Sequence, residues 1–153
     1  ELPGGGLRHT DHGPAEGPLF LEDHALAARA WLDLYEIDAR PSDLRTARDL
    51  VDFMLENFAH PSRALHDRSP EPGRPHFPVF DRLMPSGNGV AAQVLIRLYR
   101  LTGHSPYLEA AEGILTALIG PNLDRAANMG ALGRGLFDYL HASAIQKTQS
   151  EPE

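Results

Sequence analysis

The sequence of 153 residues contains no cysteine. Without cysteine, these residues cannot form a disulfide framework, a thiolate nucleophile, a cysteine-ligated zinc site or a CxxC redox pair. Positive charge is also scarce: the sequence has 14 Lys and Arg and 21 Asp and Glu, so its formal net charge is −7. An acidic surface repels phosphate backbones and anionic lipids, so we expect neither a nucleic-acid partner nor a membrane partner.

Long apolar runs are absent as well. The longest, from Val90 to Ile96, is interrupted by Gln93. A membrane-spanning helix needs about twenty consecutive apolar residues, so the sequence predicts no such helix. No signal peptide is recognisable. We therefore expect a cytoplasmic location. The sequence starts at Glu1 rather than at methionine, which indicates a processed chain or a piece of a longer protein.

Apolar residues recur with the period of an α-helix in five stretches. These stretches are 21–38, 43–58, 87–102, 106–119 and 124–141. Ser42 and Ser105 are placed to cap the second and fourth helices, with Pro106 in the first helical position, and Gly103 suits the C-terminal cap of the third. The prolines in residues 61–85 exclude a continuous helix between the second and third stretches.

The helices differ in how their apolar residues are distributed. The second and fourth are apolar on one face only, whereas the first and third are apolar on most of their circumference, which predicts that neighbours enclose them. This alternation indicates an all-α fold of two-layer helical hairpins, with an ordinary helix bundle as the alternative. The composition divides the chain into an irregular arm over 1–18, an α/α-hairpin domain over 19–142 and a disordered tail over 143–153.

Several segments together carry a family resemblance. They are FLEDHA at 20–25, LDLYE at 32–36, DRLMPSGNGVAA at 81–92 and LYRLTG at 98–103. In this order they resemble the C-terminal part of the YyaL-type thioredoxin-domain-containing proteins, the spermatogenesis-associated thioredoxin-like family. The resemblance runs from about residue 19 to residue 139, and PSGNGVAA is its most specific part.

The resemblance implies that about five main helices form part of an (α/α)6 toroid, similar to six-hairpin glycosidases and N-acylglucosamine 2-epimerases. This chain would supply about two and a half of the hairpins. Full-length members of the family carry an N-terminal thioredoxin-like domain, and the family has no securely assigned activity. The resemblance therefore implies a fold more strongly than a function.

In such a toroid the inner helices converge on a central funnel, so the starts of the first and third helices should border a pocket. The candidate pocket-lining residues are Glu22, Asp23, Asp81, Ser86 and Asn88. Helix N-termini suit anionic or hydroxyl-rich ligands, and paired carboxylates across a funnel are what glycoside hydrolysis needs. Each candidate also has a structural alternative, as a helix cap, a first-turn acid or a turn-stabilising carboxylate. No catalytic residue is assigned.

Two other features contain residue types or apolar anchors that could form a site. His9 and His12 flank Asp11 in the glycine-rich arm, where no rigid element would orient metal ligands, so we expect no metal and no cofactor. The proline-rich stretch between the second and third helices has apolar anchors at Phe77 and Phe80. It is therefore predicted to form a rim or lid over one mouth of the funnel.

These observations describe an uncharacterised fragment of an α/α toroid, whose expected partner is a carbohydrate or another small polar ligand. The alternatives are a non-catalytic scaffold or protein-interaction module accompanying a thioredoxin-like domain, and a helical domain without a ligand. Whether the parent protein is a glycosidase-like or epimerase-like enzyme stays open, and the fragment alone is expected to be inactive. Because the first and fifth helices would each lack a neighbour, we expect self-association through their exposed apolar faces.

Overall fold

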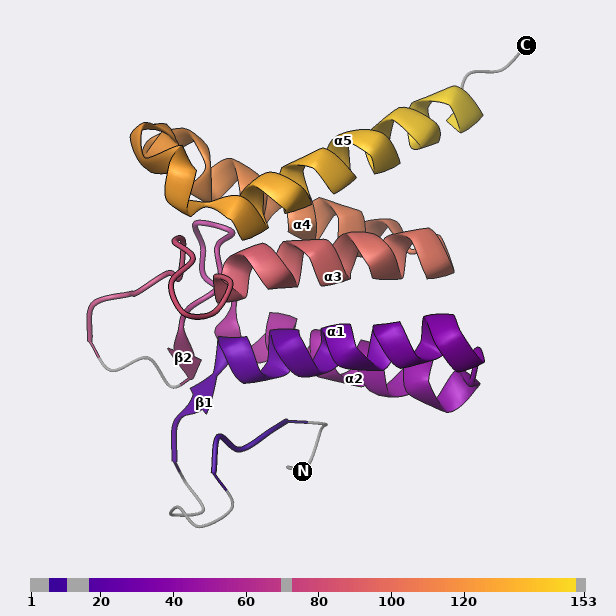
Figure 1. Ribbon diagram of the computed structural model, residues 1–153, viewed down its shortest axis with the longest axis horizontal. Coiled ribbons are helices and arrows are strands. Elements are labelled where there is room, and N and C mark those ends of the chain that lie inside the picture. Colours follow the sequence, from indigo (N-terminus) through magenta and orange to yellow (C-terminus); the bar gives the residue numbers. More distant parts are fainter. Residues whose placement is uncertain (1–5, 11–16, 70–72, 151–153) are drawn as a thin grey trace.

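The structure is a computed structural model that describes residues 6–10, 17–69 and 73–150, with side chains described up to Ile145. Within these residues the chain forms six helical segments and two short strands, which pair as a β-ribbon (Figure 1). In order they are β1 (Leu19–Phe20), α1 (Leu21–Asp38), α2 (Pro41–Phe58), β2 (Arg68–Ser69), α3 (Gly87–Thr102), α4 (Ser105–Leu118), the 3-10 segment η1 (Gly120–Asn128) and α5 (Gly130–Ser150).

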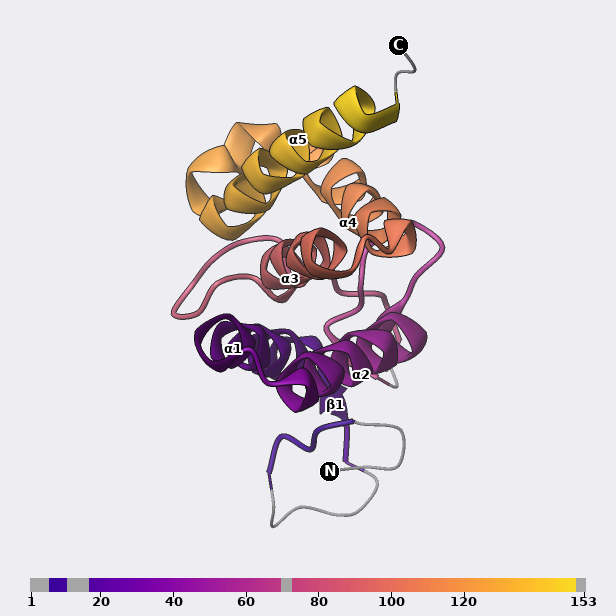
Figure 2. The same ribbon diagram turned by 90° about the vertical axis from the view of Figure 1, so that its right-hand side faces the viewer.

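The helices form two layers. Helices α1, α3 and α5 lie in a row, with α3 packed against both of the others, and α2 and α4 form a second layer beside them (Figure 2). Each second-layer helix packs on the helix that precedes it in the chain, α2 on α1 and α4 on α3. This arrangement confirms the predicted all-α fold of helical hairpins.

Helix α3 is the centre of the core. Residues 87–92 and 94–96 are all buried, which confirms the enclosure predicted for this helix. Gly89 lets α5 approach closely, because a Cβ atom built there would lie 2.6 Å from the Cβ of Ala131. The small side chains at the start of α3 are thus required by the packing of α5.

Helix α1 is enclosed on one side only. Leu21, Ala25, Ala28 and Leu32 are buried, whereas Leu34 is 44% exposed and Ile37 is 78% exposed. The enclosure predicted for the whole of this helix is therefore wrong for the side that faces away from α3, because α1 is the end of the row. The exposure of apolar residues predicted for the end helices is present.

The capping predictions hold for α3 and fail for α2 and α4. The hydroxyl of Ser86 accepts a hydrogen bond from the N–H of Gly89, and Gly103 ends the helix with a φ of 70°. Helix α2 begins one residue before Ser42, at Pro41, and α4 begins at Ser105 itself. Proline fits the first turn of a helix, so the helical conformation extends past both predicted caps.

The predicted fifth helix, residues 124–141, is also corrected. Residues 120–128 form η1, in which Asn122 and Arg125 have non-helical backbone angles, and α5 starts only at Gly130. At its other end α5 continues to Ser150, so residues 143–150, expected as a disordered tail, are helical. The last residues of that tail, 151–153, lie outside the described residues.

The predicted arm is partly described, and residues 6–10 of it pack on the helices. Leu7 donates its backbone N–H to Nε2 of His24, whose Nδ1 lies 2.7 Å from the carbonyl oxygen of Phe20. Gly6 is buried against the ring of Phe53, which stacks on His24. Desolvation by burial lowers the pKa of His24, against the opposing effects of Phe20 and Asp23.

Candidate functional site

A cavity of about 710 Å³ lies at the N-terminal ends of α1 and α3. Its walls are the segment before α3, the starts of α1 and α3, and one residue of η1. The lining residues are Glu22, Asp67, His76, Phe77, Pro78, Val79, Phe80, Arg82, Leu83, Met84, Pro85, Ser86, Gly87 and Arg125. Residues 76–80 and 82–85, in the second half of the proline-rich stretch, line this cavity, and we refer to residues 76–85 as the rim. Its place over the mouth of a funnel stays a prediction. Pro70 and Pro72, in its middle, lie outside the described residues.

Backbone hydrogen bonds fix the wall that contains Asp67. Its carbonyl oxygen accepts from the N–H of Leu21, which satisfies one of the free donors at the start of α1, and its own N–H donates to the carbonyl of His76. The β1–β2 ribbon pairs Phe20 with Arg68 immediately beside it. The start of α1 and the rim are thus joined at this residue.

Charged groups are distributed unevenly around the cavity. Glu22, from the first turn of α1, and Asp67 provide two carboxylates on the α1 side, and Nδ1 of His76 lies 3.6 Å from a carboxylate oxygen of Asp67. On the η1 side, the guanidinium carbon of Arg125 lies 3.8 Å from the centroid of the Phe80 ring. The site therefore offers acceptors at one end and guanidinium donors at the other.

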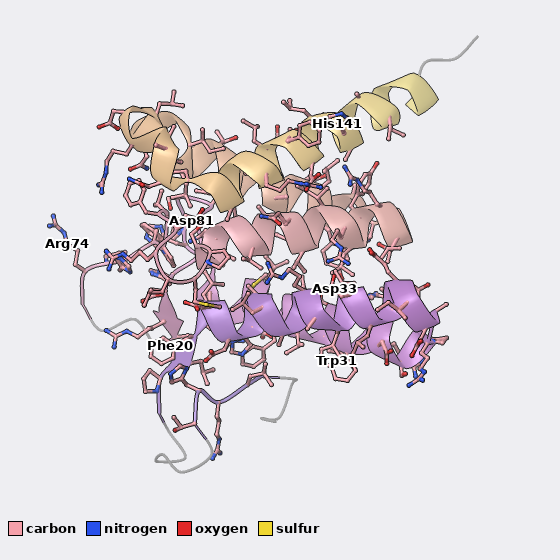
Figure 3. All side chains as sticks on the ribbon, viewed as in Figure 1. Phe20, Trp31, Asp33, Arg74, Asp81 and His141 are labelled. Atoms are coloured by element: carbon pink, nitrogen blue, oxygen red, sulfur yellow. The ribbon has the colours of Figure 1, made fainter. Side chains whose placement is uncertain are left out.

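Asp81 connects two helices rather than lining the cavity. One carboxylate oxygen accepts from the N–H of Ser86, before α3, and the other accepts from the N–H of Ala131, at the start of α5. Its own N–H donates to the carbonyl of Asn128. Figure 3 shows Asp81 between the starts of α3 and α5. These contacts are structural, as in the alternative role of a turn-stabilising carboxylate.

Of the other predicted pocket residues, Glu22 and Ser86 line the cavity, whereas Asp23 and Asn88 do not. Asp23 accepts a hydrogen bond of 2.8 Å from His9 in the arm. The amide of Asn88 is buried and binds the backbone of Leu65.

Four polar residues of the cavity are not among the candidates that the sequence predicts: Asp67, His76, Arg82 and Arg125. The first three belong to the long segment without regular structure, where spacing carries no information about direction. The sequence predicts Arg125 within the fifth helix, whereas the structure places it in η1, with non-helical backbone angles and its guanidinium over Phe80. The prolines and aromatic residues around positions 75–80 are the sequence feature that indicates a role of this segment in the site.

The described part of the chain contains no group of three or more His, Asp or Glu suited to hold a metal ion. Of the predicted metal-capable residues, Asp11 and His12 lie outside the described residues. None of the helices among the described residues has the length and apolar character to cross a bilayer.

No family model matches the chain. Among curated proteins, spermatogenesis-associated protein 20 of Mus musculus is 33% identical over 118 residues, which cover 74% of this chain and 15% of the relative. The Homo sapiens protein of the same name is 32% identical over 120 residues, which cover 75% and 15%. The chain therefore spans only about 15% of the length of these relatives.

Among solved structures, the chain is similar to an inactive variant of the alpha-1,6-mannanase GH76A of Salegentibacter sp. HEL1_6 in complex with alpha-1,6-mannotriose. The TM-score is 0.63 at 20% sequence identity, and the match covers 76% of this chain and 34% of the mannanase chain. A likeness at this identity shows the fold, which is that of an α/α toroid. Together the comparisons confirm the resemblance seen in the sequence: this chain is homologous to part of spermatogenesis-associated protein 20, of the YyaL-type thioredoxin-domain family, and folds as part of an α/α toroid.

Proposed function

We propose that this chain forms the part of a carbohydrate-binding or carbohydrate-active toroid that borders the ligand. The observation that carries the proposal is the position of the cavity, where the N-terminal ends of α1 and α3 meet the rim of residues 76–85. Ligand sites in proteins are concave and combine apolar walls with a few converging polar groups. Phe77 and Phe80 supply the apolar walls, and Glu22, Asp67 and Ser86 supply acceptors for sugar hydroxyls.

The fold supports the same proposal. The mannanase of similar fold was solved with mannotriose bound, and we carry the ligand class, rather than the particular sugar, to this chain. Glycoside hydrolysis uses two carboxylic acids on either side of the scissile bond. Glu22 and Asp67 are the carboxylate residues that line the cavity, so they are the residues that we propose for such a role in the parent protein.

A glycan array probed with the complete 153-residue chain tests this proposal. We expect binding to a defined set of oligosaccharides, lost in Glu22→Gln and in Asp67→Asn and kept in Asp49→Asn, a matched control on the exposed side of α2. The two cavity variants remove charge at half-exposed positions, so both should fold. Silence over all glycans, or equal binding by all four proteins, would contradict the proposal.

A second candidate function, a scaffold or interaction module, is favoured by the two ends of the helix row. The α1 open face consists of Ala27, Ala30, Leu34 and Ile37, spaced three and four residues apart, as in helices that pack on another helix. The α5 open face exposes Phe137, Leu140 and Ile145 by 54%, 56% and 55%. Trp31 lies beside the α1 open face and points away from α3 (Figure 3).

We propose that these faces mediate self-association of the isolated chain, in addition to any contact with a thioredoxin-like domain of the parent protein. Sedimentation velocity over a hundredfold range of concentration should show a dimer or larger species. Ile37→Lys and Leu140→Lys should each shift the equilibrium towards monomer, and Leu123→Lys, at an equally exposed leucine of η1, should not. A monomer at all concentrations would refute self-association.

A further inference from the structure

If the cavity binds a carbohydrate, as proposed above, the distribution of charge around it indicates which class of carbohydrate fits. Glu22 and Asp67 lie on the side formed by α1 and the β-ribbon, and Arg125 belongs to η1 on the far side of α3 (Figure 1). Arg82 follows Asp81, whose backbone and carboxylate are bonded to Asn128 and Ala131 on that same far side. Elements on the α1 side thus contribute the carboxylates of the cavity, which we call its acidic end, and η1 with the segment bonded to it contributes the arginines, which we call its basic end.

Among the described residues, none neutralises the basic end. Within the described residues, no carboxylate lies within ion-pair distance of Arg82 or Arg125. The arginines that do form pairs are elsewhere: Arg97, for example, binds Asp33 and Glu36 on the opposite side of α3 from η1. In a chain with a net charge of −7, two guanidinium groups that line one cavity without a carboxylate partner are suited to an anion from outside.

The geometry of Arg125 suits a planar anion in particular. Its guanidinium carbon lies 3.8 Å above the Phe80 ring, so the face of the group is occupied by the ring. Stacking of this kind leaves the N–H groups at the edge of the guanidinium available, and that edge matches a carboxylate with two parallel hydrogen bonds. Phe80 thus orients Arg125 as a donor.

The acidic end suits hydroxyl groups. Carboxylates only accept hydrogen bonds when ionised, and the hydroxyls of a sugar ring are donors. A ligand that fits both ends has a carboxylate at one end and a hydroxylated ring at the other.

We propose that the cavity binds a carboxylate-bearing sugar, with the carboxylate at Arg82 and Arg125 and the ring hydroxyls at Glu22 and Asp67. This assignment distinguishes a uronic acid from a neutral sugar of the same ring. It also predicts the orientation of the ligand, with its carboxylate directed towards η1.

Isothermal titration calorimetry on the 153-residue chain tests the assignment, with a glucuronate-containing oligosaccharide and its neutral glucose counterpart as probes. The uronate should bind at least about tenfold more tightly, since a charge-assisted pair of hydrogen bonds contributes about one such factor. Arg82→Gln and Arg125→Gln should each remove about that factor for the uronate and leave the neutral sugar unchanged. Arg45→Gln, on the exposed side of α2, should change neither.

The outcomes separate this inference from the function on which it rests. Equal affinity for the uronate and the neutral sugar, or a uronate affinity that both cavity variants keep, would overturn the carboxylate assignment and leave a carbohydrate site. Absence of binding to both probes and to the glycan array would overturn both proposals. Arg125→Lys adds a further check, because lysine keeps the charge without the planar edge and should bind the uronate less tightly than the native chain does.

Discussion

The side-chain amide of Asn88 pairs with the backbone of Leu65 through two hydrogen bonds. Its Oδ1 accepts from the N–H of Leu65 and its Nδ2 donates to the carbonyl of Leu65, both at 2.9 Å. The same Nδ2 lies 3.2 Å from the carbonyl oxygen of Pro78. Asn88 is fully buried in the first turn of α3. One side chain therefore binds the segment between α2 and α3 to the core at two points, Leu65 and Pro78.

Replacement of Asn88 by alanine should therefore destabilise the fold. The change leaves a buried N–H and a buried carbonyl of Leu65 without partners, at a cost of about 2–4 kcal/mol. Chemical denaturation monitored by circular dichroism measures this free energy. Asn57→Ala, which removes one hydrogen bond within α2, is the control and should cost less than about 1.5 kcal/mol. Equal effects would contradict the role given to Asn88.

Asp81 should behave as a positioning residue. Asp81→Ala removes the acceptors for the N–H groups of Ser86 and Ala131, so we expect a loss of about 2–3 kcal/mol in the free energy of unfolding. Amide hydrogen exchange should quicken at the start of α5 while the middle of α3 stays protected. Asp124→Ala, at an exposed position of η1, should leave exchange at both places unchanged. Unaltered protection of Ala131 in Asp81→Ala would show that the carboxylate does not hold α5.

The close approach of α5 to α3 predicts opposite effects for two glycines. A Cβ at Gly89 would lie 2.6 Å from the Cβ of Ala131, so Gly89→Ala should cost about 1–3 kcal/mol through overpacking. A Cβ at Gly133, in α5, would meet nothing within 4 Å. Gly133→Ala should therefore be neutral or stabilise by up to about 1 kcal/mol, as alanine does in an exposed helix. Thermal unfolding of both variants measures the contrast, and a neutral Gly89→Ala would contradict the packing.

His24 makes the stability of the fold depend on pH. Its pKa in the folded chain is lowered from 6.5, chiefly by desolvation, so the folded state binds fewer protons than the unfolded state in the range just below that value. The neutral ring of His24 contributes fully to the free energy of unfolding above about pH 6.5, and this contribution is lost as the pH falls through the pKa of the folded state. Protonation would also set an N–H of the ring against the N–H of Leu7, which now donates to it.

Urea denaturation between pH 7.5 and 5 tests this dependence. The native chain should lose stability as the pH falls, and the slope should shrink in His24→Gln whatever the overall stability of that variant. An identical slope in the native chain and in His24→Gln would assign the dependence to other groups.

The sequence predicts the fold where apolar residues recur with the period of a helix. The uncharged stretch from Gly89 to Ile96 correctly predicted the buried centre of the core, because an apolar circumference has few structural solutions. The first helix is apolar in the same way, yet its far side is open. Composition shows which faces can be buried, and only the number of neighbours present decides which of them are.

The site was predictable where a helix terminus determined it. Glu22 and Ser86 border the cavity because each stands at the start of a helix in the row. Asp67, His76 and Arg82 lie in a segment without regular period, where tertiary hydrogen bonds rather than local pattern set the path. Asp81 is a candidate for chemistry by residue type, but one of the two hydrogen bonds that its carboxylate accepts comes from Ala131 of α5, fifty residues later in the chain.

Chemical-shift mapping of the isotope-labelled chain during titration with a carbohydrate that it binds tests the central claim most directly. We expect the perturbed amides to lie around the cavity, at Glu22, Phe80, Ser86 and Gly87, and the amides of α4 and of the distant end of α3 to stay unperturbed. Perturbations centred instead on the α1 open face or the α5 open face, with the cavity silent, would contradict it and favour the interaction module.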